Sequence, residues 1–161
     1  MGQEVLRDGE CVVFLNDDHP NVLIVTWTGA ATLQSVERFY AWCRTHIAEA
    51  EAAGRKLVLV NDAIDAERPE AAVREAFARH HLTSNTVVAA PVVLTSALVR
   101  GAMTAVGWIM GDRMKGVSAC ATMQEAFELA RASLAECNVL LDMSALADYR
   151  RPSVKARAAS G

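Results

Sequence analysis

The stretch that decides the fold is KLVLVND, residues 56–62. Residues 57–60 are all branched and apolar, with no polar break, and the run ends abruptly in Asn61 and Asp62. A strand that is apolar on both faces belongs in the middle of a parallel sheet that helices cover on both sides. The stretch therefore predicts the central strand of an α/β domain.

Helical patterns lie on both sides of this strand. Thr32 can cap a helix that ends before Gly54, and Pro69 suits the first position of another helix. Alternating strands and helices imply right-handed crossovers, and an early hairpin makes the sheet mixed. We predict an α/β fold with a mixed, mostly parallel five-stranded sheet and four helices, in the order β-β-α-β-α-β-α-β-α. The predicted strands are residues 11–15, 22–28, 56–62, 86–94 and 115–121, and the predicted helices are residues 32–53, 69–81, 97–110 and 122–137.

Composition and charge suggest how the 161 residues are divided. At 52% hydrophobic, the chain can bury a core without disulfides or metal. We predict a polar lead-in (1–10), the α/β domain (11–137), a short apolar docking segment (138–148) and a basic, disordered tail (149–161). The tail has a formal charge of +4, which leaves −7 for residues 1–148 from the total of −3. This balance argues against a nucleic-acid-binding protein.

The cysteines give no sign of a disulfide framework or a metal site. All four are widely spaced, and none belongs to a CxxC motif. Cys43 and His46 have the spacing of half a zinc site, but no second pair exists to complete it. The first ten residues lack the apolar core of a signal peptide. We therefore expect a reduced, cytoplasmic protein without metal or cofactor.

Residues 87–110 are apolar enough to raise the question of a membrane span. Pro91, the pair Thr95 and Ser96, and the charge of Arg100 interrupt the segment. A buried strand followed by a helix explains this pattern, so we predict no transmembrane segment.

The predicted helix 97–110 has no polar face. Its only charged residue is Arg100. Such a helix is either buried on all sides or meets a partner, and full burial is hard to arrange in a domain of this size. We predict that the following residues contact a partner or ligand: Met103, Val106, Trp108 and Met110.

Polar residues gather where the predicted parallel strands end, which is where open α/β sheets bind ligands. Asp62 and Asp65 follow the central strand, with Asp65 in a predicted loop of residues 63–68. Ser96 lies one turn before Arg100 and could hold a small anion at a helix N-terminus, or simply cap that helix. No GxSxG, GxGxxG or P-loop motif accompanies them, so the sequence predicts no catalytic residue.

The order of elements resembles the STAS domain, the fold of anti-sigma-factor antagonists and their SpoIIAA-like relatives. The stretches that carry the resemblance are VLIVTWTG, LVLVND, PVVLTSALVRGAMTAVGW and TMQEAFELA. The resemblance implies a non-enzymatic domain that binds partner proteins, and in some members nucleotides or lipids. In the antagonists a phosphorylated Ser follows the acid after the central strand. Here Ala63 follows Asp62, so that switch is not carried over.

The sequence thus favours a STAS-like regulatory module that acts by protein–protein contact, as a homodimer or with another protein. One alternative is a carrier or sensor of a small apolar ligand or lipid, held between helix 97–110 and the sheet. Another is an enzyme or anion-binding site at the strand ends. The stretch RRPSV, around Ser153, resembles a site for basophilic kinases and predicts phosphorylation there.

Overall fold

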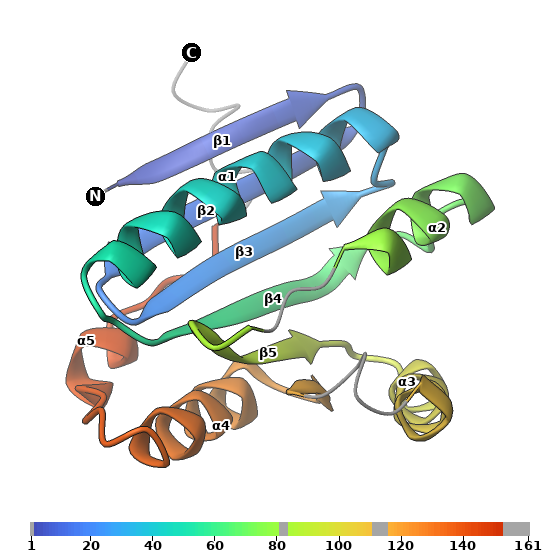
Figure 1. The fold of residues 1–161 in the computed structure, drawn as a ribbon. Coiled ribbons are helices and arrows are strands. Elements are labelled where there is room, and N and C mark those ends of the chain that lie inside the picture. The colour runs from blue at the N-terminus through green and yellow to red at the C-terminus, as the bar shows by residue number, and fades with distance from the viewer. Residues whose placement is uncertain (1, 81–83, 111–115, 153–161) are drawn as a thin grey trace.

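The KLVLVND stretch lies inside a six-stranded sheet in a computed structural model of the chain (Figure 1). The structure describes residues 2–80, 84–110 and 116–152, and for residues 106–110 it describes the backbone only. The strands are β1 (Gln3–Asp8), β2 (Cys11–His19), β3 (Val22–Gly29), β4 (Leu57–Ala66), β5 (Val87–Val93) and β6 (Val117–Cys120). The helices are α1 (Leu33–Ala52), α2 (Ala71–Arg79), α3 (Ala97–Met110), α4 (Met123–Ala135) and α5 (Met143–Ala147).

The order of strands in the sheet follows the sequence from β1 to β6. The first two pairings, β1 with β2 and β2 with β3, are antiparallel, and the other three are parallel. The predicted α/β fold with a mixed, mostly parallel sheet is confirmed. The sheet has one strand more than predicted, and the described residues include one further helix, α5.

The additional strand, β1, lies within the residues predicted as a polar lead-in. Only Leu6 of this strand is buried, because β1 is at the edge of the sheet. A two-residue turn, Gly9 and Glu10, joins it to β2, with Asp8 paired to Cys11. A single buried side chain leaves almost no alternating pattern to recognise, which explains why the strand was missed.

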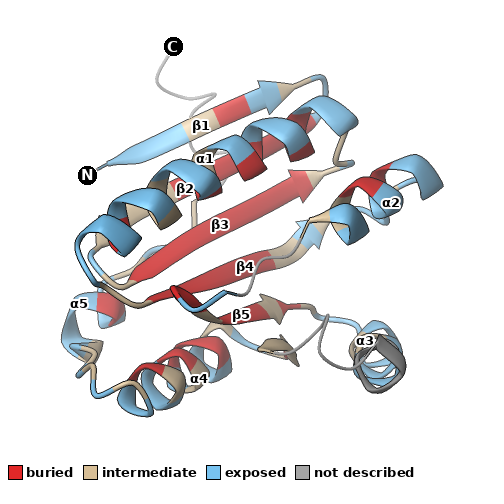
Figure 2. Ribbon diagram, in the orientation of Figure 1, coloured by how far each residue is buried: buried red, intermediate tan, exposed pale blue. Residues whose placement is uncertain are grey.

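The central strand β4 is apolar on both faces, as the sequence predicts. Leu57 and Leu59 belong to a core that includes side chains of α1 and α2. Val58 and Val60 belong to a second core that includes side chains of α4 and α5. Figure 2 shows β3 and the first part of β4 buried between the helices.

The C-terminal part of the chain completes the second core. Leu146 of α5 is 4% exposed and packs in that core, with Tyr149 against it. Of residues 138–148, the apolar side chains of Val139, Leu141, Met143 and Leu146 pack in or against this core. The first part of the predicted disordered tail, residues 149–152, lies within the described chain. In this part Tyr149 and Arg151 contact side chains of the sheet. Residues 153–161 lie outside the described residues.

Candidate functional site

Helix α3 presents an apolar surface that the rest of the described chain does not cover. Leu98 is 84% exposed and Val99 is 46% exposed. Small exposed residues continue this surface along the helix, and Figure 2 shows its described part mostly in the colour of exposed residues. We call the following six residues the α3 surface: Ala97, Leu98, Val99, Gly101, Ala102 and Ala105.

The four residues predicted for contact lie on this helix. The side chain of Met103 is half-buried. The side chains of Val106, Trp108 and Met110 lie outside the described residues, so their contact role stays a prediction.

The predicted anion site, Ser96 and Arg100, makes structural contacts instead. The backbone N–H of Val99 donates to Ser96 Oγ at 3.3 Å, which is the geometry of a helix cap. Arg100 Nη1 donates to the backbone oxygens of Leu94 (2.6 Å) and Thr95 (2.7 Å). The only charged side chain of α3 is therefore bound to the chain segment after β5, and the α3 surface itself carries no charge.

The two predicted strand-end carboxylates, Asp62 and Asp65, meet one arginine. The prediction that the central strand ends at Asp62 and that Asp65 lies in a loop is wrong, because β4 continues to Ala66 and Asp65 pairs with Thr28 of β3. Arg151 Nε and Nη2 donate to the two oxygens of Asp62, the second at 3.2 Å, and Arg151 Nη1 donates to Asp65 at 2.5 Å. The Asp62 side chain is completely buried, while that of Asp65 is 59% exposed. This is a bidentate guanidinium–carboxylate pair with a third, more exposed arm.

An irregularity in β4 brings the two carboxylates together. Side chains three residues apart on a regular strand point to opposite faces. Thr26 pairs with Asp62 and Thr28 with Asp65, so β4 has one residue more than β3 over this interval. The Ile64 N–H donates to Asp62 Oδ1 at 3.1 Å within the irregular segment. Such a bulge reorients the strand, and here it lets both aspartates reach Arg151.

Tyr149 is the second anchor of the C-terminal segment. Its hydroxyl lies 3.0 Å from Thr26 Oγ1, at hydrogen-bond distance, and its ring packs edge-on against Phe127 with centroids 6.0 Å apart. Burial raises the pKa of this phenol; the bond to Thr26 and the charge of Arg151 lower it by less. The phenol therefore stays protonated in the range where a free tyrosine would ionise.

Tyr149 and Arg151 were not among the predicted site residues. Both fall in the basic stretch that was expected to be disordered. The signal that could have identified them is an aromatic residue two positions before an arginine, in a tail whose charge is opposite to that of the domain.

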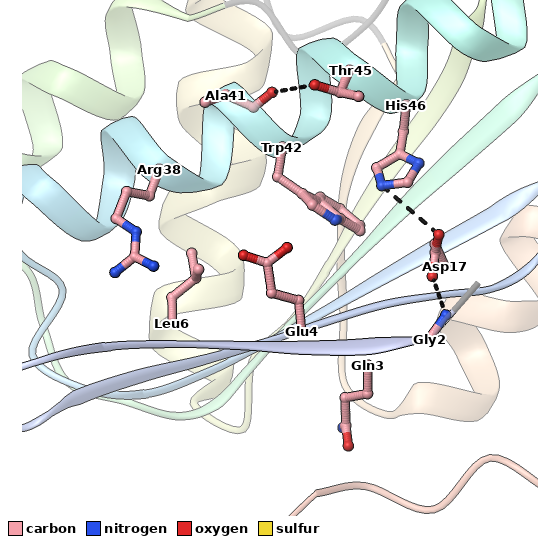
Figure 3. A pocket seen from close by; sticks show the side chains of 10 residues that line it. All are labelled: Gly2, Gln3, Glu4, Leu6, Asp17, Arg38, Ala41, Trp42, Thr45 and His46. Atoms are coloured by element: carbon pink, nitrogen blue, oxygen red, sulfur yellow. Dashed lines mark hydrogen bonds and ion pairs between the residues drawn. The ribbon is translucent and has the colours of Figure 1, made fainter.

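A pocket lies between β1 and α1 (Figure 3). It has a volume of about 660 Å³. His46 lies 3.9 Å from Asp17 Oδ2 and stacks edge-on against Trp42, and the Gly2 N–H donates to Asp17 at 2.7 Å. To recognise this pocket from the sequence, one would have had to predict strand β1. The lining residues are Gly2, Gln3, Glu4, Leu6, Asp17, Arg38, Ala41, Trp42, Thr45 and His46.

The described residues contain neither a cluster of metal ligands nor a helix able to span a membrane. Within residues 2–80, 84–110 and 116–152, no three His, Cys, Asp or Glu side chains lie together so that they could hold a metal ion. None of the helices described is both long and apolar enough to cross a membrane.

Comparison with known proteins gives a likeness of fold. No family model matches the sequence, and no curated protein is significantly similar to it. The structure is similar to the crystal structure of an uncharacterized protein of the DUF3478 family, with a SpoIIAA-like fold, from Shewanella loihica PV-4. The TM-score is 0.49 at 12% sequence identity, over 79% of this chain and 90% of that chain.

Proposed function

We propose that the chain is a non-enzymatic interaction module that acts by contact through the α3 surface. The exposure of Leu98 carries this proposal, because a leucine that is 84% exposed stands beside Val99 and small residues with no charge among them. Isolated apolar residues on a surface are ordinary, whereas a contiguous apolar surface marks an interaction site. Fully burying one such leucine contributes about 1.5–3 kcal/mol.

The polar residues predicted for a site at the strand ends make contacts that hold the fold together. Ser96 caps α3, Arg100 binds backbone oxygens, and Asp62 binds Arg151. These contacts engage the side chains that an enzyme at this edge would need for chemistry. This favours contact over catalysis as the function of the domain.

Two features of the α3 surface support a second copy of the chain as its partner. Gly101 and Ala105 lie one turn apart on the helix. Because their side chains are absent or small, they let a second helix approach closely and pack its ridges into the groove between them. A surface without charge can meet itself across a two-fold axis without repulsion. The proposed assembly is therefore a homodimer in which α3 packs against α3 of the other copy.

The test is light scattering coupled to size-exclusion chromatography of the full chain over a range of concentrations. We expect a dimer for the wild type and a monomer for Leu98→Glu, because the substitution would bury an unpaired carboxylate in the interface. The matched control is Leu140→Glu, which changes a leucine that is 94% exposed and lies outside α3, and this variant should remain a dimer.

A wild-type protein that is monomeric at every concentration would contradict the homodimer. Equal behaviour of Leu98→Glu and Leu140→Glu would contradict the use of α3. Native mass spectrometry of the same samples addresses the alternative function, since a carrier of a small apolar ligand should retain a bound molecule.

A further inference from the structure

The C-terminal strap, defined here as residues 148–152, is attached to the sheet by side chains. Tyr149 bonds to Thr26, and Arg151 bonds to Asp62 and Asp65. The backbone bond of Tyr149 goes to Leu146 in the preceding helix, and among the described residues no backbone hydrogen bond joins the strap to the sheet. Detaching the strap therefore leaves the strand pairing of the sheet intact.

The surface under the strap has the form of a site for a guanidinium group. Asp62 is completely buried and accepts from Nε and Nη2, while Asp65 accepts from Nη1, so all three nitrogens of Arg151 are bound. A planar fork of donors fits this arrangement, and the point charge of a lysine does not. Thr26, which is 1% exposed and pairs with Asp62 across the strands, provides a hydroxyl for the tyrosine.

There is free space beside the strap. A pocket of about 440 Å³ borders Tyr149 and Arg151 and is also lined by Met123, Phe127 and Met143. A segment bound in place of the strap could therefore put a larger apolar side chain next to its aromatic residue, which the chain's own strap does not do.

We propose that Thr26, Asp62 and Asp65 form a recognition site for a peptide segment with an aromatic residue two positions before an arginine. In this structure the chain's own Tyr149 and Arg151 occupy the site. The strap is a removable occupant, and a partner protein binds by placing an equivalent segment there. This site is separate from the α3 surface, and the inference does not depend on the dimer.

The strap is covalently attached to the domain, and this attachment determines how the site must be tested. A covalently attached segment acts at an effective concentration on the order of millimolar, so a free peptide of equal affinity must reach about that concentration to compete. Removal of the guanidinium of Arg151 frees the two carboxylates and, among the described contacts with the sheet, leaves only Tyr149 to hold the strap, so a peptide should then compete with it at a much lower concentration.

The experiment uses the full chain and a fluorescent peptide with the sequence of the strap, Asp-Tyr-Arg-Arg-Pro, followed by fluorescence anisotropy. We expect the peptide to bind Arg151→Ala at least about tenfold more tightly than the wild type, as the strap is then easier to displace. The matched control is Arg150→Ala, because Arg150 is exposed and, among the described residues, its side chain bonds only to the neighbouring backbone oxygens of Ala147 and Tyr149. This variant should bind the peptide as weakly as the wild type.

Two changes in the peptide identify what is recognised. Replacing its second arginine by alanine should abolish binding to Arg151→Ala, and replacing its tyrosine by alanine should weaken binding several-fold. N-methylguanidinium and arginine amide distinguish a small guanidinium ligand from a peptide, since we expect each to bind at least about tenfold more weakly than the peptide.

Arg151→Lys provides a second variant in case Arg151→Ala does not fold, because lysine keeps the charge but not the fork of donors. It should also bind the peptide more tightly than the wild type. The proposal is overturned if neither variant binds the peptide more tightly than the wild type, or if binding persists without the peptide's second arginine. Binding of arginine amide as tightly as the peptide would overturn peptide recognition.

Discussion

Arg151 and Asp62 are 89 residues apart in the chain, and their side chains form a two-point ion pair in the second half of β4. The carboxylate is completely buried and the guanidinium is 28% exposed. Taking two charges out of water is unfavourable, so such a pair adds little net stability compared with apolar side chains. Removing one partner is different, because the other charge stays buried without compensation.

Arg151→Ala should lower the free energy of unfolding by about 3 kcal/mol, which is the lower end of the range for a broken buried pair because Arg151 is partly exposed. Asp65→Ala removes only the exposed arm and should cost at most about 1 kcal/mol. Urea denaturation measures both. Arg150→Ala is the control and should stay within about 0.5 kcal/mol of the wild type. An equal loss in Arg150→Ala and Arg151→Ala would contradict the specific role of Arg151.

The bond between Thr26 and Tyr149 should appear as a coupling between two substitutions. Tyr149→Phe keeps the ring against Phe127 but leaves the Thr26 hydroxyl, which is 1% exposed, without this partner. We expect a loss of about 1–2 kcal/mol for Tyr149→Phe and a similar loss for Thr26→Val. The double variant should lose less than the sum, since both polar groups are then absent. Strictly additive losses in urea denaturation would show that the two hydroxyls do not interact.

The layers of the fold were predictable from the sequence because burial leaves a local pattern. Leu57 and Leu59 face one layer of helices, and Val58 and Val60 face the other, as the unbroken apolar run implies. The pattern failed where burial is sparse. In β1 only Leu6 is buried, so its residues read as a polar lead-in.

The candidate site was predictable only in part, because its geometry depends on distant contacts. Asp62 and Asp65 were identified because they follow the apolar run of the central strand, although both lie within β4 in the structure. Their common direction depends on a bulge against β3, which no local pattern shows. The partner, Arg151, lies in a stretch whose composition is typical of a disordered tail. The sequence shows that the tail and the domain have opposite charges, but charge alone does not say which residues pair.

Gly29 and Gly9 form a natural pair for testing backbone strain. Both have positive φ, +72° and +59°. A Cβ at Gly29 would lie 2.6 Å from the backbone oxygen of Glu10, whereas a Cβ at Gly9 would have no neighbour within 4 Å. Gly9→Ala should cost about 1 kcal/mol for the left-handed backbone alone, and Gly29→Ala about 2–4 kcal/mol because the β1–β2 turn must also move. Thermal unfolding followed by circular dichroism would reveal the difference, and equal losses would contradict the close approach.

Cys43 should make the protein sensitive to alkaline pH. Burial raises the pKa of its thiol from 9.0 to about 12, an effect that the nearby charge of Arg44 only partly opposes. Above pH 9 the unfolded chain therefore releases a proton that the folded chain keeps. The free energy of unfolding then falls as the pH rises from about 9 towards 12, by about 1.4 kcal/mol per pH unit for this one group.

Cys43→Ala should flatten this decline by about that amount in urea denaturation between pH 9.5 and 11, because the variant has no thiol to titrate. Val36→Ala is the matched control, since Val36 is a fully buried residue of the same helix and the same core. It should lower stability at every pH by about 1–3 kcal/mol without changing the slope. Burial also raises the pKa values of Cys11, Cys120 and Tyr149, and these shifts act in the same direction in all three proteins. The pKa of Tyr40 is raised mainly by burial and to a smaller extent by Cys43, so Cys43→Ala reduces this shift too and flattens the decline further. If Cys43→Ala kept the slope of the wild type, the buried thiol would not be the group that titrates.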